Sequence, residues 1–406
     1  MNFSLTEEHR HIQSVCCSLA LDFAKRAAAH DRDASSPVEN YAALRDAGLF
    51  GLTAPKGLGG WGAGMLGYVL AAEELAQGCA STALSFNMHC VILMGLTVRS
   101  PYSAATQQHA ADLAITEGKL IAALLSEPGT TNLLYSTRAS TTQARRVAGG
   151  YILEGKKAFG SMVEVSDYIA LFAHPAQEHN PAAGVLALFP TDTPGIRIEH
   201  VWDTLGMRGT RSDTVFFENC FVAEDAVLDE FIMPSIPEWL ATEEALVNLP
   251  YTAVYLGVGI AVLKAVTTYV QNRQPRGYAQ PVAYHPDVRR RVAKISAELE
   301  AARWLLRYAA WTFDTDEIGA DETLAAYLKA KYVVGETVAS ATRSALEIGG
   351  GHAIFKGEEI ERLFRDGATA TIMQPSSDVC LSALSVYELQ LDRDQIQSPL
   401  KLTEDG

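Results

Sequence analysis

The sequence predicts an α+β protein with three parts in a fixed order. These are an N-terminal helical domain (residues 1–120), a middle β-domain (121–230) and a C-terminal four-helix bundle (231–406). Near both ends of the chain, apolar residues recur at the three-to-four-residue spacing of amphipathic helices. The middle instead has short alternating or β-branched segments bounded by Gly, Pro, Asn and Asp, which is typical of strands. With 48% hydrophobic and 20% charged residues, the chain has the composition of a folded globular protein.

The N-terminal part is expected to contain four helices. Ser4 and Glu7 have the spacing of a capping box for a helix that continues to Ala29. A second helix, 40–47, ends at Gly48, and a buried helical pair covers 67–98 after a Gly- and Pro-rich connection.

The rest of the chain divides into strands and then long helices. Gly149-Gly150 predicts a hairpin turn between two strands, and the strand block continues to about Leu228. The bundle helices are expected at 249–271, 287–314, 321–348 and 374–391.

Charge and cysteine content exclude several classes of protein. The net charge of −15 disfavours nucleic acid as a partner, although a small anion can still bind at a local basic pocket. The six cysteines are scattered, so we expect neither a metal site nor a disulfide framework, but buried thiols in a reducing, cytoplasmic compartment. No apolar run reaches the roughly 18 residues expected of a membrane span, and the first residues lack a signal-peptide core.

Three segments, in order, carry a family resemblance. They are SEPGTTN at 126–132 with GKKAFGS at 155–161, then LGMRGTRSDT at 205–214, then GGGH at 349–352 with ERLFRD at 361–366. Together they resemble the acyl-CoA dehydrogenase superfamily over essentially the whole chain. The resemblance implies a flavin-dependent oxidoreductase that acts on an acyl thioester, of CoA or of an acyl carrier protein, or on a related small molecule. It also implies a homo-oligomer, either a dimer or a tetramer.

The first segment has a physical reading of its own. A Ser-Glu-Pro-Gly turn exposes backbone N–H groups and hydroxyls, which suit the polar edge of an isoalloxazine ring. The resemblance implies that the hydroxyls of Ser126 and Ser161 contact the flavin and that Phe159, where the family usually has tryptophan, packs on the ring. Asn132 and Arg208 match positions near the flavin and the substrate pocket, although a structural hydrogen-bonding role is equally open for Arg208.

The adenine-diphosphate half of FAD is held across a subunit contact in this family. The matching positions are Arg273, Arg276, Gly350 and Gly351. Glu347 departs from the usual glutamine, and a carboxylate beside a pyrophosphate is unfavourable unless an arginine intervenes. FAD is therefore the first choice of cofactor, and FMN or a reduced flavin supplied by another protein is the alternative.

The catalytic glutamate of the family is missing. Its position, nine residues after Arg365, is Gln374, and the alternative position on the first bundle helix is Leu249. Neither side chain is a base, and losing a positioned base costs about two to four orders of magnitude in rate. One interpretation is that Glu243, Glu244 or Asp378, which lie near these positions in sequence, replaces the base.

The other interpretation is different chemistry. Two-component monooxygenases of the superfamily lack the glutamate and accept reduced FMN or FAD from a flavin reductase. They keep a hydroxyl at the Ser161 position and a histidine at the His89 position, so His89, Asn132 and Ser161 become candidates for oxygen chemistry. His89, between Met88 and Cys90 on a buried helix, also fits a core residue. A non-catalytic partner subunit is the third possibility, and Arg365 and Asp366 are read as a structural pair.

Overall fold

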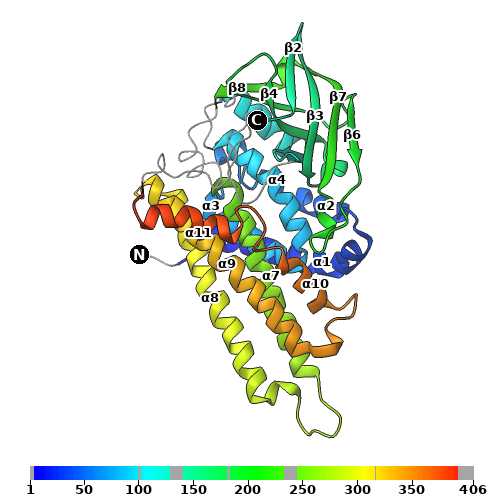
Figure 1. Ribbon diagram of the computed structural model, residues 1–406, viewed down its shortest axis with the longest axis vertical. Helices are drawn as coiled ribbons and strands as arrows, with labels where there is room; N and C mark the ends of the chain where they lie inside the picture. The colour runs from blue at the N-terminus through cyan, green and yellow to red at the C-terminus, as the bar shows by residue number, and fades with distance from the viewer. Residues whose placement is uncertain are drawn as a thin grey trace, which may run out of the picture.

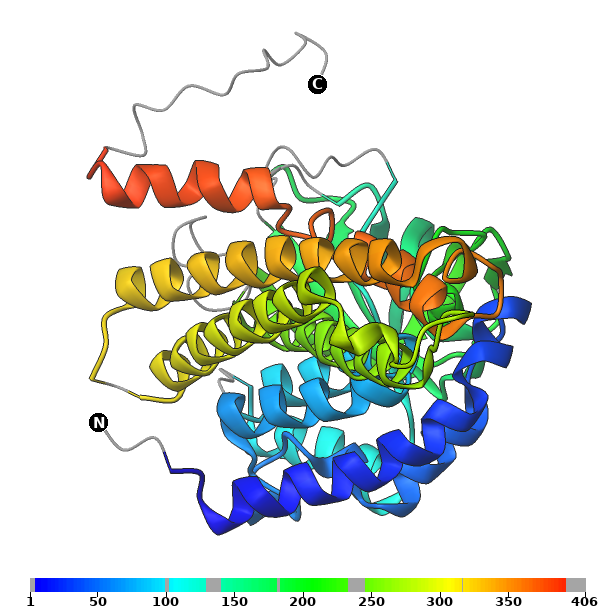
Figure 2. The ribbon, with the colours of Figure 1, turned by 90° about the horizontal axis from the view of Figure 1, so that it is seen from below.

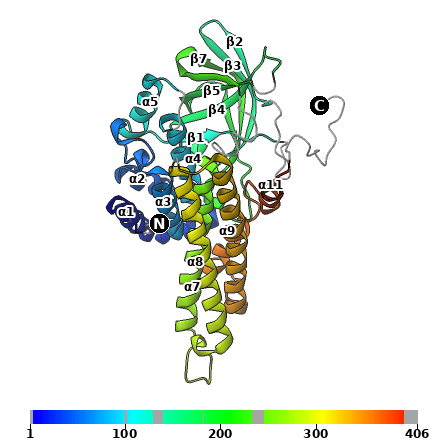
Figure 3. The same cartoon turned by 90° about the vertical axis from the view of Figure 1, so that its left-hand side faces the viewer.

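The computed structural model describes residues 4–98, 102–128, 140–180, 183–232, 245–315 and 317–391. Helices precede and follow a block of strands, so the predicted α+β architecture is confirmed. The sheet lies at one end of the molecule, and three long C-terminal helices extend away from it side by side (Figures 1 and 3).

The N-terminal helices largely follow the prediction. They are α1 (Glu7–Asp33), α2 (Val38–Asp46), α3 (Gly64–Gly78), α4 (Ala80–Thr97) and α5 (Ala104–Ala111). The predicted capping residue is wrong: the N-cap is Thr6, not Ser4. Thr6 is extended and its hydroxyl accepts the N–H of His9 at 3.1 Å, which satisfies one of the free donors at the helix start.

One eight-stranded sheet forms the middle of the chain. Its strands are β1 (Ile121–Leu124), β2 (Gln143–Val147), β3 (Gly150–Gly160), β4 (Tyr168–Pro175), β5 (Ala183–Pro190), β6 (Ile196–Glu199), β7 (Asp213–Ala223) and β8 (Val227–Ile232). The strand order is β6-β7-β3-β2-β4-β5-β8, and β1 pairs in parallel with β4. The predicted hairpin is confirmed, because β2 and β3 pair with Val147 opposite Gly150 and Gly149 has a φ of +81°.

In the described residues of the C-terminal part there are three long helices and two shorter ones. They are α7 (Ala245–Asn272), α8 (Pro286–Asp314), α9 (Ala320–Gly349), α10 (Glu359–Ala368) and α11 (Ser377–Glu388). The last predicted helix starts later than expected, because Ser376 caps it by accepting the N–H of Val379. Gln374 therefore lies in the turn before α11, and the sequence reading missed α10.

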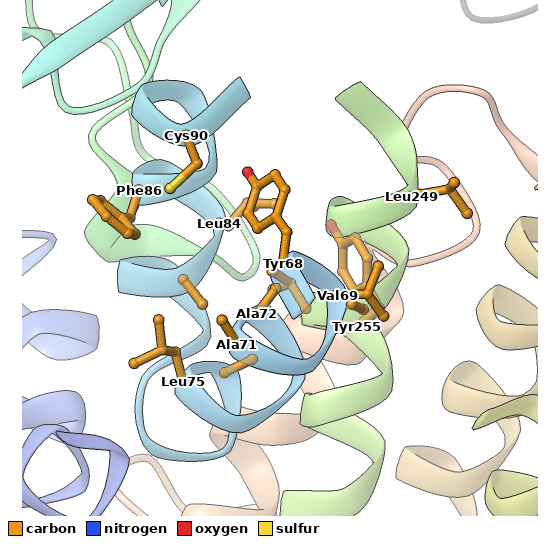
Figure 4. Close-up of a cluster of buried hydrophobic side chains, with 14 of the residues drawn as sticks. Tyr68, Val69, Ala71, Ala72, Leu75, Leu84, Phe86, Cys90, Leu249 and Tyr255 are labelled. Atoms are coloured by element: carbon orange, nitrogen blue, oxygen red, sulfur yellow. The ribbon is translucent and has the colours of Figure 1, made fainter. Parts of the chain in front are cut away.

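The core is centred on α3, α4 and α7. Tyr68 and Val69 of α3 pack near Leu84 of α4 and Tyr255 of α7 (Figure 4). The expectation that no segment is long and apolar enough to span a membrane is corrected. Both α4 and α7 pass that test, but 94% and 83% of their windows are buried in the protein. Helices enclosed on all sides are apolar all round, which gives the same signal.

The N-terminal helices and the bundle form one block. α1 lies along one side of it and α11 along the opposite side, with the long helices between them (Figure 2). An ion pair joins the two parts, because Arg303 of α8 donates to the buried carboxylate of Glu73 of α3 at 3.0 Å. This block supports the end of the sheet where the polar site residues gather.

Candidate active site

An exposed aromatic ring marks the end of β3 nearest the helices. The pairing of β3 with β7 is irregular between Lys157 and Gly160, and Phe159 within that irregularity has a φ of +55°. Its side chain is 58% exposed, and its ring meets Trp202 edge to face at 6.0 Å. Phe159 therefore offers an open face on which a planar ring can stack.

Trp202 is held in place by a buried carboxylate. Asp213, at the start of β7, accepts the N–H groups of Val201 and Trp202 at 2.8 and 3.0 Å. The Trp202 indole donates to the carbonyl of Met207 at 3.1 Å. The wall beside Phe159 is thus fixed by hydrogen bonds and not only by packing.

A chain of hydroxyls starts at Ser161. Its Oγ lies 2.7 Å from the Oγ of Ser212, which lies 2.8 Å from the Oγ1 of Thr210. Thr210 in turn donates to the carbonyl oxygen of Met207 at 2.9 Å. Ser161 is only partly buried, whereas Ser212 and Thr210 are buried, so the chain runs from the open site into the protein.

A buried ion pair anchors the turn that carries Ser126. Lys157 Nζ lies 2.5 Å from Glu127 Oε1, and both side chains are buried. Burial opposes ionisation of Glu127, but Lys157 and the hydroxyls of Ser140 and Thr141 outweigh it and lower the pKa of Glu127 to about 2. Ser126 itself is partly buried, and its carbonyl accepts the N–H of Ala158 at 3.0 Å.

No role was predicted from the sequence for Glu127 or Lys157, which appear there only within the SEPGTTN and GKKAFGS motifs. The strand pattern points to this pair. Successive side chains on a strand face opposite sides, so Lys157, next to exposed Lys156, faces the interior of the sheet. A buried lysine requires an acidic partner, and Glu127 lies on the adjoining turn. Asn132 lies outside the described residues.

His89 has both ring nitrogens in use within the protein. Nε2 lies 2.9 Å from the carbonyl of Phe50, and Nδ1 accepts the N–H of Ile121 at 3.1 Å. Burial lowers the pKa of His89 to about 4, so the ring is neutral. These contacts connect α4 to the first strand and leave no ring nitrogen for a ligand, which is the arrangement of a core residue.

Arg208 is likewise engaged by the protein. Its guanidinium donates to the carbonyls of Asp31 and Thr204 at 2.8 and 2.9 Å and pairs with Asp203 at 2.7 Å. These bonds tie the 203–208 turn to the end of α1. They favour the structural alternative over substrate binding.

Arg365 joins three parts of the fold. It pairs with Asp31 of α1 at 2.8 Å and with Glu361 of its own helix at 2.7 Å, and it donates to the carbonyl of Leu205 at 3.0 Å. The hydrogen bond to Asp31 is the main reason that the pKa of Arg365 is raised. This geometry agrees with the structural role expected of Arg365.

Asp366 continues the same contact. Its carboxylate accepts the N–H of Met207 at 2.7 Å. A Cβ at Gly206 would lie 2.3 Å from the carbonyl oxygen of Arg365, so only glycine allows α10 to approach this turn. Asp366 therefore fixes the residue on which the hydroxyl chain ends.

Neither position expected to hold the family's base has a carboxylate. Gln374 is exposed in the turn before α11, and Leu249 is fully buried in α7. Of the three substitutes, Asp378 is exposed in the first turn of α11, whereas 243 and 244 lie outside the described residues. Buried Lys331 supports the turn by donating to the carbonyl of Ala370 at 3.0 Å.

The tip of the bundle brings together the residues expected at the diphosphate. Arg273 and Arg276 are exposed between α7 and α8, and Tyr269 connects this end to the glycine cluster by donating to the carbonyl of Gly349 at 3.0 Å. A Cβ placed on Gly350 or Gly351 would meet nothing within 4 Å, so their backbone is open to a ligand.

Glu347, whose carboxylate would disfavour a neighbouring pyrophosphate, is paired with arginines at the same tip. Its carboxylate pairs with Arg291 at 2.9 Å and with Arg343 at 3.2 Å. Two arginines thus compensate the one carboxylate. The residues present fit the diphosphate of a flavin dinucleotide.

One group has the composition of a metal site. Glu164, His200 and Asp213 place possible ligand atoms within 4.8 Å of one another. The guanidinium of Arg211 lies among them, 2.8 Å from Asp213 and 2.6 Å from His200. Because Arg211 also donates to the carbonyl of Ala34 at 3.3 Å, the group connects the sheet to the N-terminal helices.

Comparison with known proteins identifies all three parts of the chain. Residues 6–111, 122–220 and 249–385 match the N-terminal, middle and C-terminal domains of acyl-CoA dehydrogenase. A probable acyl-CoA dehydrogenase, YngJ of Bacillus subtilis, is 26% identical over 388 residues, covering 93% of this chain and 97% of the relative. An L-evernosamine nitrososynthase of a Micromonospora species is 27% identical over 404 residues, covering 96% and 92%. The structure of KijD3 with FMN and a dTDP-linked amino sugar has a TM-score of 0.82 at 24% identity, covering 97% and 96%.

Breaking the buried Glu127–Lys157 pair is expected to destabilise the protein strongly. Lys157→Met removes the ammonium counter-charge of the buried Glu127 carboxylate and should lower the free energy of unfolding by about 3–5 kcal/mol. Urea unfolding measures the change, and the double variant Glu127→Gln with Lys157→Met should recover part of it. Lys119→Ala, which breaks an exposed pair with Asp167, is the control and should cost at most about 1 kcal/mol. Equal losses in both single variants would contradict the assignment.

The neutral, buried state of His89 makes the fold sensitive to acid. Because its folded pKa of about 4 is below the unfolded value of 6.5, the unfolded chain binds the extra proton in that window. Stability should therefore be lost as pH falls from 6.5 towards 4, by about 3 kcal/mol at most. His89→Gln should lose less stability over this window in urea unfolding. A histidine resonance of His89 that titrates near 6.5 in NMR would contradict this account.

Proposed function

Because the chain belongs to the acyl-CoA dehydrogenase superfamily, a family of flavin oxidoreductases, we propose that it oxygenates a small molecule with reduced flavin from a partner reductase. The proposal rests on the two positions expected to hold the family's base, because neither has a carboxylate. Gln374 has an amide without useful basicity, and Leu249 is apolar and fully buried. Removing an α-proton from an acyl thioester needs such a base, whereas oxygenation by reduced flavin does not.

The described residues suit flavin binding beside β3. Phe159 supplies an aromatic face, Ser161 a hydroxyl at the polar edge, and the anchored turn at Ser126 closes the site. When bound, the reduced flavin supplies the electrons that activate oxygen. The protein's own part is to stack the ring, orient its edge and hold the substrate beside it.

The positive bundle tip supports FAD over FMN. Arg273, Arg276 and the open backbone of Gly350 and Gly351 suit a diphosphate, and Glu347 is compensated. This tip lies at the opposite end of the molecule from the sheet (Figures 1 and 3). One chain cannot place both surfaces on one flavin, so the proposal includes a homo-oligomer, dimer or tetramer, in which one subunit's tip reaches its neighbour's flavin.

A second candidate is dehydrogenation of an acyl thioester, bound as a CoA or carrier-protein ester. Asp378 favours this candidate, because it is an exposed carboxylate in the first turn of α11, shortly after Gln374 in the sequence. Curated relatives at similar identity include both dehydrogenases and a nitrososynthase, so overall similarity does not decide between the two reactions.

Anaerobic titration of the flavin-loaded protein separates these candidates. We expect that acyl-CoA thioesters of several chain lengths will not bleach the oxidised flavin, because no base removes the α-proton. Under an 18O2 atmosphere in place of air, with reduced flavin from a reductase, a panel of amines and aromatic heterocycles should yield a product that carries 18O by mass spectrometry. Gln374→Glu is the matched variant and should gain acyl-CoA bleaching if its pocket binds the thioester.

Two results would contradict the proposal. Bleaching of the wild-type flavin by an acyl-CoA, abolished in Asp378→Asn, establishes the dehydrogenase candidate. A chain that binds no flavin in either oxidation state fits a non-catalytic partner subunit.

Because Arg291 neutralises Glu347, substitutions at these two residues should have coupled effects on FAD binding. Arg291→Gln removes one of the two arginines that compensate Glu347 and should weaken FAD binding about three- to fivefold at low salt. Adding Glu347→Gln should restore the affinity, and FMN, which lacks the second phosphate, should respond in neither case. Calorimetry measures the dissociation constants, and Lys294→Gln, which breaks an exposed pair with Glu298, is the control. No recovery in the double variant would contradict compensation.

A further inference from the structure

The hydroxyl chain behind Ser161 has only one direction that satisfies all of its bonds. The carbonyl of Met207 can only accept, so the Thr210 hydroxyl donates to it. With its proton used, Thr210 can only accept from Ser212, and Ser212 can then only accept from Ser161. Each hydroxyl has one proton, so every bond in the chain points inward.

This direction decides what Ser161 can offer to a ligand. Its proton points to Ser212, so only the lone pairs of its oxygen face the open side of the site. A group that meets this oxygen must bring a hydrogen of its own. Ser161 is therefore an acceptor towards the ligand, although a serine hydroxyl is generally both donor and acceptor.

The surroundings keep the chain from reversing. Met207 is fixed by the carboxylate of Asp366 on its N–H and by the Trp202 indole on its carbonyl. Thr210 and Ser212 are buried, with 1% and 6% of their surface exposed. Reversal would turn the Thr210 proton to Ser212 and remove its bond to the Met207 carbonyl, so the reversed chain makes one internal hydrogen bond fewer.

We propose that this chain makes the site selective for the reduced flavin, with Ser212 and Thr210 as positioning residues that act through Ser161. The inference rests on the proposed function, in which Ser161 meets the N5 edge of the ring. N5 of an oxidised flavin has a lone pair and no hydrogen, so it faces the lone pairs of Ser161. N5 of a reduced flavin bears an N–H, which Ser161 accepts.

Selectivity of this kind suits an enzyme that receives its flavin already reduced. The reduced form is captured from the reductase, and the oxidised form leaves after turnover. By linkage, each tenfold preference for the reduced form raises the two-electron potential of the bound flavin by about 30 mV over the free flavin.

The test is the ratio of dissociation constants for oxidised and reduced flavin, measured anaerobically with FAD and with FMN by fluorescence and calorimetry. The full-length wild type should bind the reduced form about tenfold more tightly, as expected for one hydrogen bond made in only one state. Ser212→Ala and Thr210→Val should bring the ratio to near one, because each frees the proton of Ser161 or lets the chain reverse. Ser212→Thr keeps the hydroxyl and should keep the ratio.

Two further variants complete the design. Ser166→Ala is the control, because this buried serine forms a hydroxyl pair with Thr191 in the same domain but is not part of the hydroxyl chain behind Ser161. It should leave the ratio unchanged. Ser161→Ala removes the acceptor itself and should abolish the preference without disturbing the buried groups, so a failure of Ser212→Ala to fold does not end the test.

The outcomes distinguish a failure of the selectivity inference from a failure of the proposed function. Tight flavin binding with a wild-type ratio near one, or a tenfold ratio that persists in both Thr210→Val and Ser161→Ala, overturns the inference and leaves the proposed function standing. Binding of neither oxidation state overturns the proposed function and this inference with it.

Discussion

The site depends on one contact, where α10 meets the turn before β7. The guanidinium of Arg365 binds Asp31 of the N-terminal part and the carbonyl of Leu205 of the middle part. Asp366, the next residue, accepts the N–H of Met207. The three parts of the chain thus meet at a buried, charge-assisted cluster, and such bonds are stronger and more directional than neutral ones. Apolar packing alone would bring these surfaces together without fixing the orientation of the turn.

That orientation reaches the flavin edge through Met207. Its carbonyl is the fixed end of the chain through Thr210 and Ser212, and Ser161 is the end that faces the ligand. Phe159, two residues before Ser161, is turned outward by the irregular pairing of β3. The stacking face and the polar edge are therefore set by the same short segment. Structural hydrogen bonds far from the ligand thus turn the Ser161 proton away from it and leave the oxygen lone pairs facing it.

Much of the fold was readable from the sequence, because helical and strand periodicities are strong in long segments. Gly149-Gly150 also marked its hairpin correctly. Errors fell where two local signals compete: Thr6 caps α1 instead of Ser4, and Ser376 begins α11 after Gln374. The ten-residue α10, whose residues carry the ERLFRD motif, was missed as a helix.

The site was less predictable than the fold. Motifs located Phe159 and Ser161, but the partner that neutralises Glu347 lies 56 residues away on another helix, and the proton direction at Ser161 depends on a backbone carbonyl. The absorption spectrum of the purified full-length protein, with chromatography of any flavin it releases, tests the central claim of reduced flavin supplied in turnover most directly. The purified protein should be nearly colourless and should take up flavin when it is offered in the reduced form. A yellow protein that retains stoichiometric oxidised FAD through purification would contradict it.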